Sequence, residues 1–357
     1  MAGPSVLSLD ITALLTSTLM KQSSSLADNI SLANYAFYRL KEKGMFQETS
    51  DIGERLKVNL MYGLAPTSTY AGYDQLPVDP VDGLTAAFFD WKNAVTPISI
   101  SGDEKAKNRG SAVQVINLLT TKAQQARTSI TEFWGKAFMQ GNGINNPTDV
   151  LNPYTDPSNS STFIDPLPSL VRFDPTASAT IGNINQSTSV WWRNQLKNDT
   201  STTFAGFRKN LRNLFNNCGK GGGGANRYPN IHICDQSTYE FYEEMMTAFF
   251  RNTSYVRSDI PFENITFRNY PLTWDENVID AANGSTTQSA TSGTWYMLNS
   301  SNFGITADSM WNFKARPAVE PANQDASVSQ IIWRGCSWVN ARRKHGVQGS
   351  IDTTITS

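Results

Sequence analysis

The chain has 357 residues, 39% of them hydrophobic, and a formal net charge of -1 from 30 basic and 31 acidic side chains. Its length exceeds what one hydrophobic core usually holds, so the sequence predicts two packed units with extensions. The apolar fraction argues against general disorder, and the balanced charge excludes a protein whose overall field attracts nucleic acid. We expect any contact with DNA to be weak and local.

The sequence shows no sign of export or of a membrane anchor. Cys218, Cys234 and Cys336 are odd in number and widely spaced, which predicts neither a disulfide framework nor a zinc site and favours a reducing compartment. No apolar run approaches the roughly 20 residues that a membrane span needs, and no basic segment precedes the first apolar stretch. We therefore expect a protein that is neither secreted nor membrane-bound.

Residues 1–55 show one short amphipathic pattern near their middle. Leu32, Tyr35 and Leu40 recur between polar positions, and Gly44 supplies a helix stop. We interpret this region as an N-terminal arm that lies apart from the core.

Residues 56–105 predict an extended β-hairpin loop. Apolar residues alternate around Val58 and again from Ala87 to Ile100, which is typical of two long strands, and the segment between them is too long for a tight turn. An isolated hairpin is only marginally stable, so its aromatic side chains need a covering surface, either a neighbouring subunit or the body of the same chain. These aromatic residues are Tyr70, Tyr73, Phe88, Phe89 and Trp91.

The segment from Gly110 to Gly141 predicts a single long helix. Its apolar residues recur at alternating spacings of three and four without an internal proline, over a length of about 45 Å. The apolar stripe is narrow and rich in alanine, which favours packing of one face across a sheet over a coiled coil. The stripe consists of Ile116, Leu119, Ala123, Ala126, Ile130, Phe133 and Ala137.

A mixed α/β unit follows an irregular stretch. Residues 142–190 are rich in Asn, Pro, Ser and Asp, which predicts a surface link between two units. Beyond it, the pattern predicts a helix over 204–215, a strand over 231–234, and a second helix that begins at a capping box of Ser237 and Glu240. Strand patterns continue to about residue 325 and recur in a last strand over Val328 to Val339, before a polar tail.

The glycine cluster after residue 218 resembles a phosphate-binding loop only formally. Gly219, Gly221 and Gly224 match the dinucleotide pattern, but the loop follows a helix and precedes a strand, which is the reverse of the required order. Gly221 also follows Lys220, where a nucleotide-binding P-loop needs Ser or Thr to bind magnesium. We interpret the cluster as a flexible loop.

No residue set in the sequence predicts catalysis. His232 lies two residues from Cys234 on an apolar strand, where no third group would orient a Cys-His pair, so we predict a core histidine. The second histidine, His345, lies in a basic run. Glu243 and Glu244 are adjacent on a helix and point about 100° apart, which is poor geometry for an acid/base pair.

Four segments carry a resemblance to a known family. They are Ile181 to Gln195, Pro229 to Glu243, Trp295 to Asn299 and Arg342 to Val347. These segments, together with the order of the predicted elements, resemble the major capsid proteins of tailed phages, which have the Hong Kong phage (Johnson) fold. The resemblance covers the chain from about Arg55 onward.

The resemblance implies an α+β capsid fold with four regions. Residues 1–55 would form the N-terminal arm and residues 56–105 the extended loop. A peripheral domain with a spine helix would combine 106–145 with 326–357, and residues 146–325 would form an axial α/β domain.

The resemblance also implies self-assembly. The chain would form pentamers and hexamers of an icosahedral head around double-stranded DNA, with a separate scaffolding protein and a portal as partners and with no cofactor, metal or catalytic residue. It would be assembled in the host cytoplasm and reside in the capsid shell of the virion. We predict that the intersubunit interface includes Tyr70, Tyr73, Trp91, Arg342, Arg343 and Lys344.

Two alternatives remain open from the residues alone. Abundant Asn, Ser, Thr and aromatic residues are compatible with an adhesin-like surface binding module, although no secretion signal supports it. An enzyme with a cleft in the unit at 206–325 is the other alternative, but no convergent set of histidines, carboxylates or metal ligands supports it.

Overall fold

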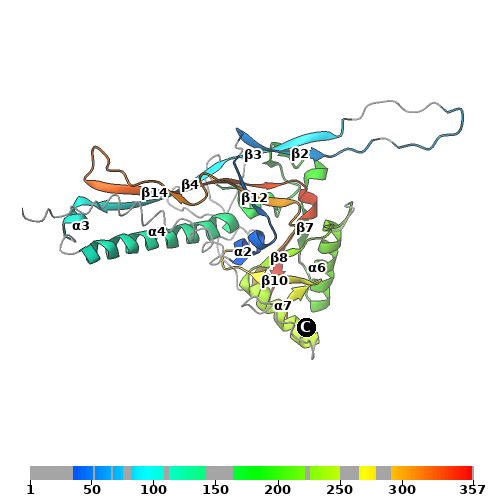
Figure 1. Cartoon of the computed structure of the whole chain (residues 1–357). Helices are drawn as coiled ribbons and strands as arrows, with labels where there is room; N and C mark the ends of the chain where they lie inside the picture. Colours follow the sequence, from blue (N-terminus) through cyan, green and yellow to red (C-terminus); the bar gives the residue numbers. More distant parts are fainter. Residues whose placement is uncertain are drawn as a thin grey trace, which may run out of the picture.

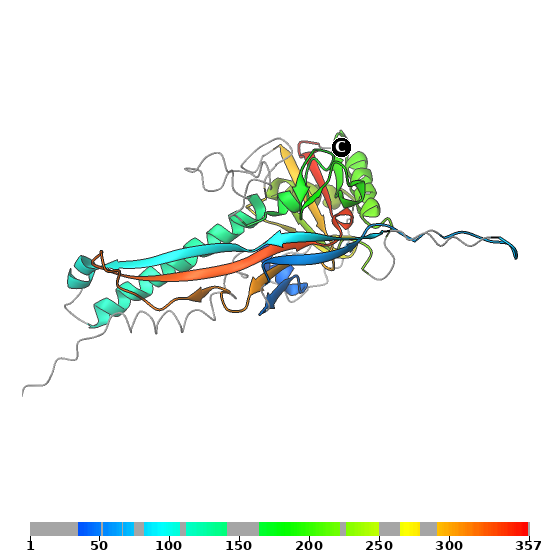
Figure 2. The same ribbon diagram turned by 90° about the horizontal axis from the view of Figure 1, so that it is seen from above.

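The computed structural model shows an elongated α+β subunit with two large β-sheets, a long helix along one of them and a two-stranded hairpin that projects from the body (Figure 1, Figure 2). The described residues are 35–50, 53–65, 67–74, 82–107, 112–140, 164–221, 226–249, 265–278 and 291–355. Within these ranges, no helix is both long and apolar enough to cross a membrane.

The first sheet has five strands and is organised around β14 (Ala326–Val339). Its residues 326–335 pair antiparallel with the whole of β4 (Lys92–Ser101), and the strand also pairs with β12 (Phe303–Asp308) and β13 (Lys314–Ala315). At the edge, β1 (Phe46–Thr49) pairs parallel with β12. Buried and exposed side chains alternate along β4 and much of β14, as they do in a sheet that is covered on one face.

The helix α4 (Ala112–Gln140) covers that face (Figure 1). Ala123 and Ala126 are buried, and their small side chains allow the helix to approach the sheet closely. Trp134 meets Trp333 of β14 edge to face, with ring centroids 4.2 Å apart. The prediction of a long helix that packs by one face across a sheet is confirmed.

The second sheet has six strands in the order β7, β15, β11, β8, β10, β9. In that order they are Gln195–Asn198, Gly346–Asp352, Ser292–Leu298, Ile231–Cys234, Tyr270–Trp274 and Thr266–Phe267. The helices α6 (Phe204–Cys218) and α7 (Gln236–Phe249) pack on one face, where Phe207 of α6 contacts Phe241 of α7 and Trp295 of β11. The helices and strands predicted for this unit are therefore present.

Two of the connections between the two sheets, β11 to β12 and β14 to β15, lie side by side. The backbone N–H of Asn340 donates to Asn302 O at 3.1 Å, and the N–H of Asn299 donates to His345 Nδ1 at 3.2 Å. As a result, the last strand, β15, lies inside the second sheet. For these residues the sequence predicted a polar tail, not a strand. Its sequence GVQGSID has few apolar residues, so the alternation that identifies strands is weak there.

The described part of the predicted N-terminal arm packs on the body. The helix α2 (Tyr35–Glu42) ends before Gly44, whose φ of 70° terminates it as predicted. Leu40 and Met45 are fully buried, and β1 then joins the first sheet. The prediction that this stretch lies apart from the core is wrong, because the polar sequence of β1 conceals an edge strand. Residues 1–34 lie outside the described residues.

The predicted second strand of the hairpin is two strands. β2 (Arg55–Met61) pairs antiparallel with β3 (Leu84–Asp90), but the chain then enters β4, which pairs with β14. The hairpin therefore ends at Asp90, not near Ile100. Both β3 and β4 alternate with the same period of two, so the sequence pattern does not reveal where the pairing partner changes.

The helix α7 has a different cap from the predicted one. The helix begins at Gln236, and the carboxylate of Asp235 accepts hydrogen bonds from the N–H and the hydroxyl of Thr238 at 3.2 and 2.6 Å. Ser237 lies inside the first turn, so the predicted capping box is wrong. Asp235 is the stronger cap here because it also accepts from the N–H of Thr294 at 2.7 Å, which ties the helix to β11.

Candidate assembly surfaces

The β2–β3 hairpin carries a group of exposed apolar side chains. Tyr70 and Tyr73 are 68% and 107% exposed and lie midway along the segment that joins β2 to β3. This part of the chain projects from the body (Figure 2). Other exposed apolar side chains of the hairpin are Met61, Leu64 and Leu84. Apolar groups gathered on a projecting element mark a surface that another molecule covers.

The three predicted aromatic contact residues are placed differently. Tyr70 and Tyr73 are open to solvent, whereas Trp91 is half-buried against the main core. The indole N–H of Trp91 donates to Gly53 O at 3.0 Å. The chain itself thus covers part of Trp91, and contact of all three residues with a neighbouring subunit stays a prediction.

A tight turn receives the base of the hairpin. The turn joins β5 (Thr180–Ile181) to β6 (Ile184–Asn185). Gly182 and Asn183 have φ values of 61° and 64°, as the two central residues of a type I′ turn require. Gly182 O accepts from the N–H of Phe88, and a Cβ on Gly182 would lie 2.8 Å from the Cβ of Ala87. Both the backbone and the close approach to β3 therefore require glycine.

An aromatic stack forms the second contact, at the end of the β2–β3 ladder where the loop begins. Tyr62, which follows β2, stacks on Trp191 with ring centroids 5.2 Å apart and an interplanar angle of 19°. Trp191 belongs to the 3-10 turn η2 (Val190–Trp192), and the indole N–H of Trp192 donates to Ile181 O at 3.0 Å. The hydrogen bond of Trp192 thus connects the Tyr62–Trp191 stack to the turn between β5 and β6.

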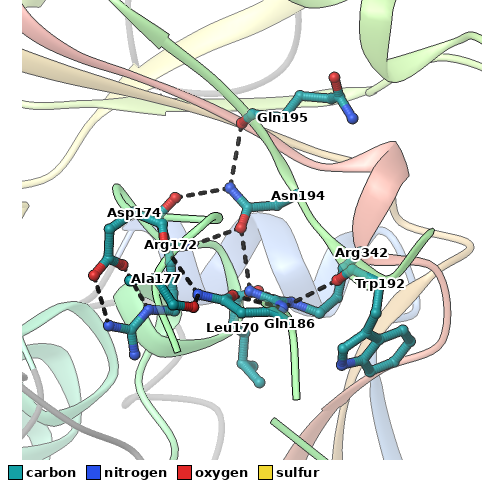
Figure 3. Close-up of polar contacts among 9 residues, drawn as sticks. All are labelled: Leu170, Arg172, Asp174, Ala177, Gln186, Trp192, Asn194, Gln195 and Arg342. Atoms are coloured by element: carbon teal, nitrogen blue, oxygen red, sulfur yellow. Dashed lines mark hydrogen bonds and ion pairs between the residues drawn. The ribbon is translucent and has the colours of Figure 1, made fainter. Parts of the chain in front are cut away.

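Arg342 is fully buried, so the prediction that it lies at an intersubunit surface is wrong. It begins η4 (Arg342–Lys344), and its guanidinium donates to neutral oxygens of one stretch of chain (Figure 3). The acceptors are Leu170 O at 2.8 Å, Gln186 Oε1 at 3.1 Å, Trp192 O at 3.0 Å and Asn194 Oδ1 at 3.1 Å. These oxygens replace the water that burial removes from the charge.

Two buried amides, which the sequence analysis missed, extend these contacts (Figure 3). Gln186 Nε2 donates to the carbonyls of Asp174 and Ala177 at 2.9 and 3.0 Å. Asn194 Nδ2 donates to Arg172 O at 2.8 Å, and Asn194 Oδ1 accepts from the N–H of Arg172 at 3.1 Å. An amide carries donors and acceptors together, so each side chain ties two stretches of backbone.

We call residues 170–194 together with Arg342 the hairpin seat. The prediction of an irregular surface link over 142–190 is wrong for residues 167–171, since α5 (Leu167–Leu170) and Val171 are buried. Beyond them the chain is irregular and largely exposed or partly exposed up to residue 190, with only the two-residue strands β5 and β6. Residues 141–163 lie outside the described residues. Gln186 and Asn194 of the seat are buried and serve internal hydrogen bonds, although other polar residues of the seat, such as Ser178 and Asn183, are exposed.

Two residues of the basic run remain at the surface. Arg343 is exposed and Lys344 is partly exposed. A 3-10 turn points successive side chains in different directions, so one member of the run can be buried while its neighbours face solvent. The interface prediction stays a prediction for Arg343 and Lys344.

His232 and Cys234 do not form a catalytic pair. His232 Nδ1 accepts from the indole N–H of Trp295 at 3.4 Å, and Cys234 Sγ lies 3.6 Å from Thr273 O, to which it donates. Burial lowers the pKa of His232 to about 3 and raises the pKa of Cys234 well above its ordinary value. Both groups favour their neutral forms and have other partners, so His232 is the core histidine that the sequence predicts.

The other chemical candidates are also placed. Glu243 and Glu244 are exposed on α7, as predicted. Gly219 follows α6, but Gly224 lies outside the described residues. The prediction that the glycine cluster forms a flexible loop therefore also falls outside them. Within the described ranges, no group of three or more His, Cys, Asp or Glu side chains could hold a metal ion.

The first sheet also exposes branched apolar side chains on the face turned away from α4. Val95 of β4 is 58% exposed and lies opposite Ile332 of β14. Val319, 64% exposed, pairs with Val328 by an isolated bridge on the same sheet. A flat sheet face with exposed branched side chains can receive an apolar element of another molecule.

Comparison with known proteins identifies the fold. No protein-family model matches the chain, and no curated protein sequence matches it. Among solved structures, the capsid asymmetric unit of cyanophage A-1(L) matches with a TM-score of 0.58 and 12% identity, over 86% of this chain and 90% of that chain.

Two further capsids match over a similar extent. The capsid of an empty GTA particle has a TM-score of 0.51 and 10% identity, over 86% of this chain and 94% of that chain. The capsid of Myoviridae phage XM1 has a TM-score of 0.51 and 8% identity, over 87% of this chain and 91% of that chain.

The chain therefore has the fold of proteins that build capsid shells. It is the Hong Kong phage (Johnson) fold, and the fold that the sequence resemblance implied is confirmed.

Proposed function

We propose that this chain is the major capsid protein of a tailed phage and forms the pentamers and hexamers of an icosahedral head around double-stranded DNA. The observation that carries the proposal is the hairpin, which projects from the body of its own chain and carries exposed apolar side chains. A subunit that gains its apolar contacts on assembly needs such a projecting element. The shared fold supports the proposal independently.

A neighbouring copy of the chain is the partner that we propose for the hairpin. Tyr70 and Tyr73 would bury their rings on the next subunit, and the apolar face around Val95 offers a surface of matching character. Repetition of one such contact around a ring closes a capsomer without an unpaired surface.

The predicted regions receive their roles in this proposal with changed bounds, since β12 and β13 belong to the first sheet, β15 to the second, and the hairpin ends at Asp90. Residues before β2 act as the arm, the hairpin as the extended loop, the first sheet with α4 as the peripheral domain, and the second sheet with α6 and α7 as the axial domain. A separate scaffolding protein and a portal are the further partners, and the subunit has no cofactor and no catalytic role. Assembly takes place in the host cytoplasm, and the mature chain resides in the virion shell.

The proposal includes only weak contact with the packaged DNA. A chain with 30 basic and 31 acidic side chains has no net positive field that would hold DNA on the shell. Tight binding of double-stranded DNA by the subunit at moderate salt would contradict this part of the proposal.

Negative-stain electron microscopy combined with sedimentation tests the function. The chain is produced alone and together with the products of its neighbouring genes. Closed shells, or ring-shaped pentamers and hexamers, support the proposal. A compact monomer under every condition contradicts it and favours a surface binding module or an enzyme.

A further inference from the structure

We propose that Arg342 is the positioning residue that sets the direction in which the hairpin leaves the subunit. Its guanidinium holds the hairpin seat in the shape that receives β3 and Tyr62. The inference deepens the proposed function, and rests on it, in one respect: the direction of the hairpin decides which neighbouring surface its tip reaches.

The hairpin is not part of either large sheet. Among the described strands, β2 and β3 pair only with each other and form a separate two-stranded sheet. Paired strands alone are flexible with respect to the body of a protein. Their inner side chains hold the strands on the body, since Leu60, Ala87 and Phe89 are buried in the main core. Two contacts with the seat add to this packing and bear on the direction in which the loop leaves: β3 meets Gly182, and Tyr62 meets Trp191.

The seat has little regular structure that could keep its own shape. Its strands β5 and β6 have two residues each, and η2 has three. Side-chain hydrogen bonds supply the missing order instead. Arg193, for example, donates from Nε to Gln186 O at 2.8 Å and from Nη2 to Ser187 O at 2.6 Å. Such a segment keeps one conformation only while its internal bonds are intact.

Arg342 joins the two ends of the seat and its middle. Leu170 and Asn194 lie at the ends, while Gln186 and Trp192 lie near the hairpin contacts, and one guanidinium reaches an oxygen of each. A planar guanidinium presents its N–H groups in a fixed fork, so it also fixes the angles between the groups that accept from it. A lysine ammonium at this position would carry the charge without the fork.

The other end of Arg342 is anchored in the second sheet. Residue 342 opens η4, and His345 at the end of that turn accepts at its carbonyl from the N–H of Gln195 at 2.9 Å. β15 begins at the next residue and pairs with β7 and β11. Arg342 thus connects the direction of the hairpin to the orientation of the second sheet.

Distances between two spin labels measure this direction. One label is placed at the tip by Tyr73→Cys and the other on α7 by Glu243→Cys, both of which are exposed positions. Cys218, Cys234 and Cys336 are buried and unpaired, so the label reacts with the introduced thiols. The labelled chain is diluted into an excess of unlabelled chain, which removes distances between subunits.

The variants Arg342→Met and Arg342→Lys are compared with the unchanged background and with Arg212→Met, which removes an exposed arginine of α6. We expect a broader distance distribution with a shifted mean for Arg342→Met, a smaller change in the same direction for Arg342→Lys, and no change for Arg212→Met. Distributions for both Arg342 variants that match the background would overturn the proposal.

A second variant decides the case if Arg342→Met does not fold. Gly182→Ala leaves Arg342 in place but puts a methyl group 2.8 Å from the Cβ of Ala87 at a left-handed backbone position. A changed distribution for Gly182→Ala and for Arg342→Lys supports the seat as the source of the direction, and unchanged distributions for both refute it. The measurement is made on the subunit, so it remains decisive even if the unchanged chain forms no shell and the proposed function fails.

Discussion

Trp134 of α4 and Trp333 of β14 pack edge to face in the core, with ring centroids 4.2 Å apart. Both side chains are fully buried, and the ring of Phe313 packs against both of them. This contact joins the long helix to the longest strand. It is therefore the point at which the first sheet and its helix depend most directly on each other.

Replacing Trp333 by Ala should destabilise the subunit strongly. Loss of a buried tryptophan removes apolar contacts and leaves a cavity, which costs about 3 to 5 kcal/mol of unfolding free energy. Denaturant unfolding of the purified subunit measures the loss. Val95→Ala is the matched control, because Val95 lies on the exposed face of the same sheet and its loss should cost no more than about 0.5 kcal/mol. Equal losses for the two variants would mean that the Trp134 contact is not part of the stable core.

Replacing Asp235 by Ala should weaken the start of α7. The change removes a helix cap and leaves the N–H of Thr294 without its acceptor, so we expect a loss of about 1 to 2 kcal/mol. Ser237→Ala, at the position that the sequence pattern favoured, should cost less. Thermal or denaturant unfolding of the two variants ranks them, and a larger loss for Ser237→Ala would restore the predicted capping box.

Acid should destabilise the subunit through His345. Burial, the main cause, lowers the pKa of His345 from 6.5 to about 4, and the nearby charges of Arg342 and Lys344 act in the same direction. Above pH 6.5 neither the folded nor the unfolded chain protonates this group. Between pH 6.5 and 4 only the unfolded chain binds the proton, so stability falls as the pH falls, by on the order of 3 kcal/mol in total.

The comparison that isolates this effect is the pH dependence of unfolding in the unchanged chain and in His345→Gln. The slope below pH 6.5 should decrease in the variant. Some slope should remain because burial also lowers the pKa of His232 to about 3. Burial raises the pKa of Asp165 to about 6, which has the opposite effect on the slope in both proteins. Identical slopes would show that the imidazole of His345 is not held neutral.

A charge at the hairpin tip should block assembly without unfolding the subunit. Tyr73 is fully exposed in the chain, so Tyr73→Glu should leave the unfolding free energy within about 0.5 kcal/mol of its original value. Burial of the new carboxylate against a neighbour would be costly, so sedimentation should show a loss of large particles. Tyr73→Phe keeps the apolar ring and should still assemble. Normal assembly of Tyr73→Glu would exclude the tip from the interface.

The sequence predicted those elements whose apolar pattern is long and regular. The helix α4 and the strand β14 both have many residues of one period, and they lie where the sequence placed them. Short or polar strands were missed, as β1 and β15 show, because four to seven residues with few apolar side chains do not stand out from loops. Their pairing partners, which are distant in the sequence, decide that they are strands.

The hairpin seat shows a second limit of sequence reasoning. Gln186 and Arg342 lie 156 positions apart, and each alone has the character of a surface residue. Nothing in the local sequence pattern around either residue indicates that the two side chains meet in the interior. The Gly182-Asn183 pair was the available signal, since Gly and Asn are the residues that a type I′ turn favours, and it would have predicted a tight turn within the supposed link.

The most direct test of the account asks what the hairpin tip touches in an assembled particle. A photoreactive amino acid is introduced at Tyr73, particles are isolated by sedimentation, and the products of irradiation are separated by size under denaturing conditions. The account predicts products of two or more chains, joined from the tip of one copy to the surface of another. Products confined to single chains, in particles that contain the variant, would contradict it.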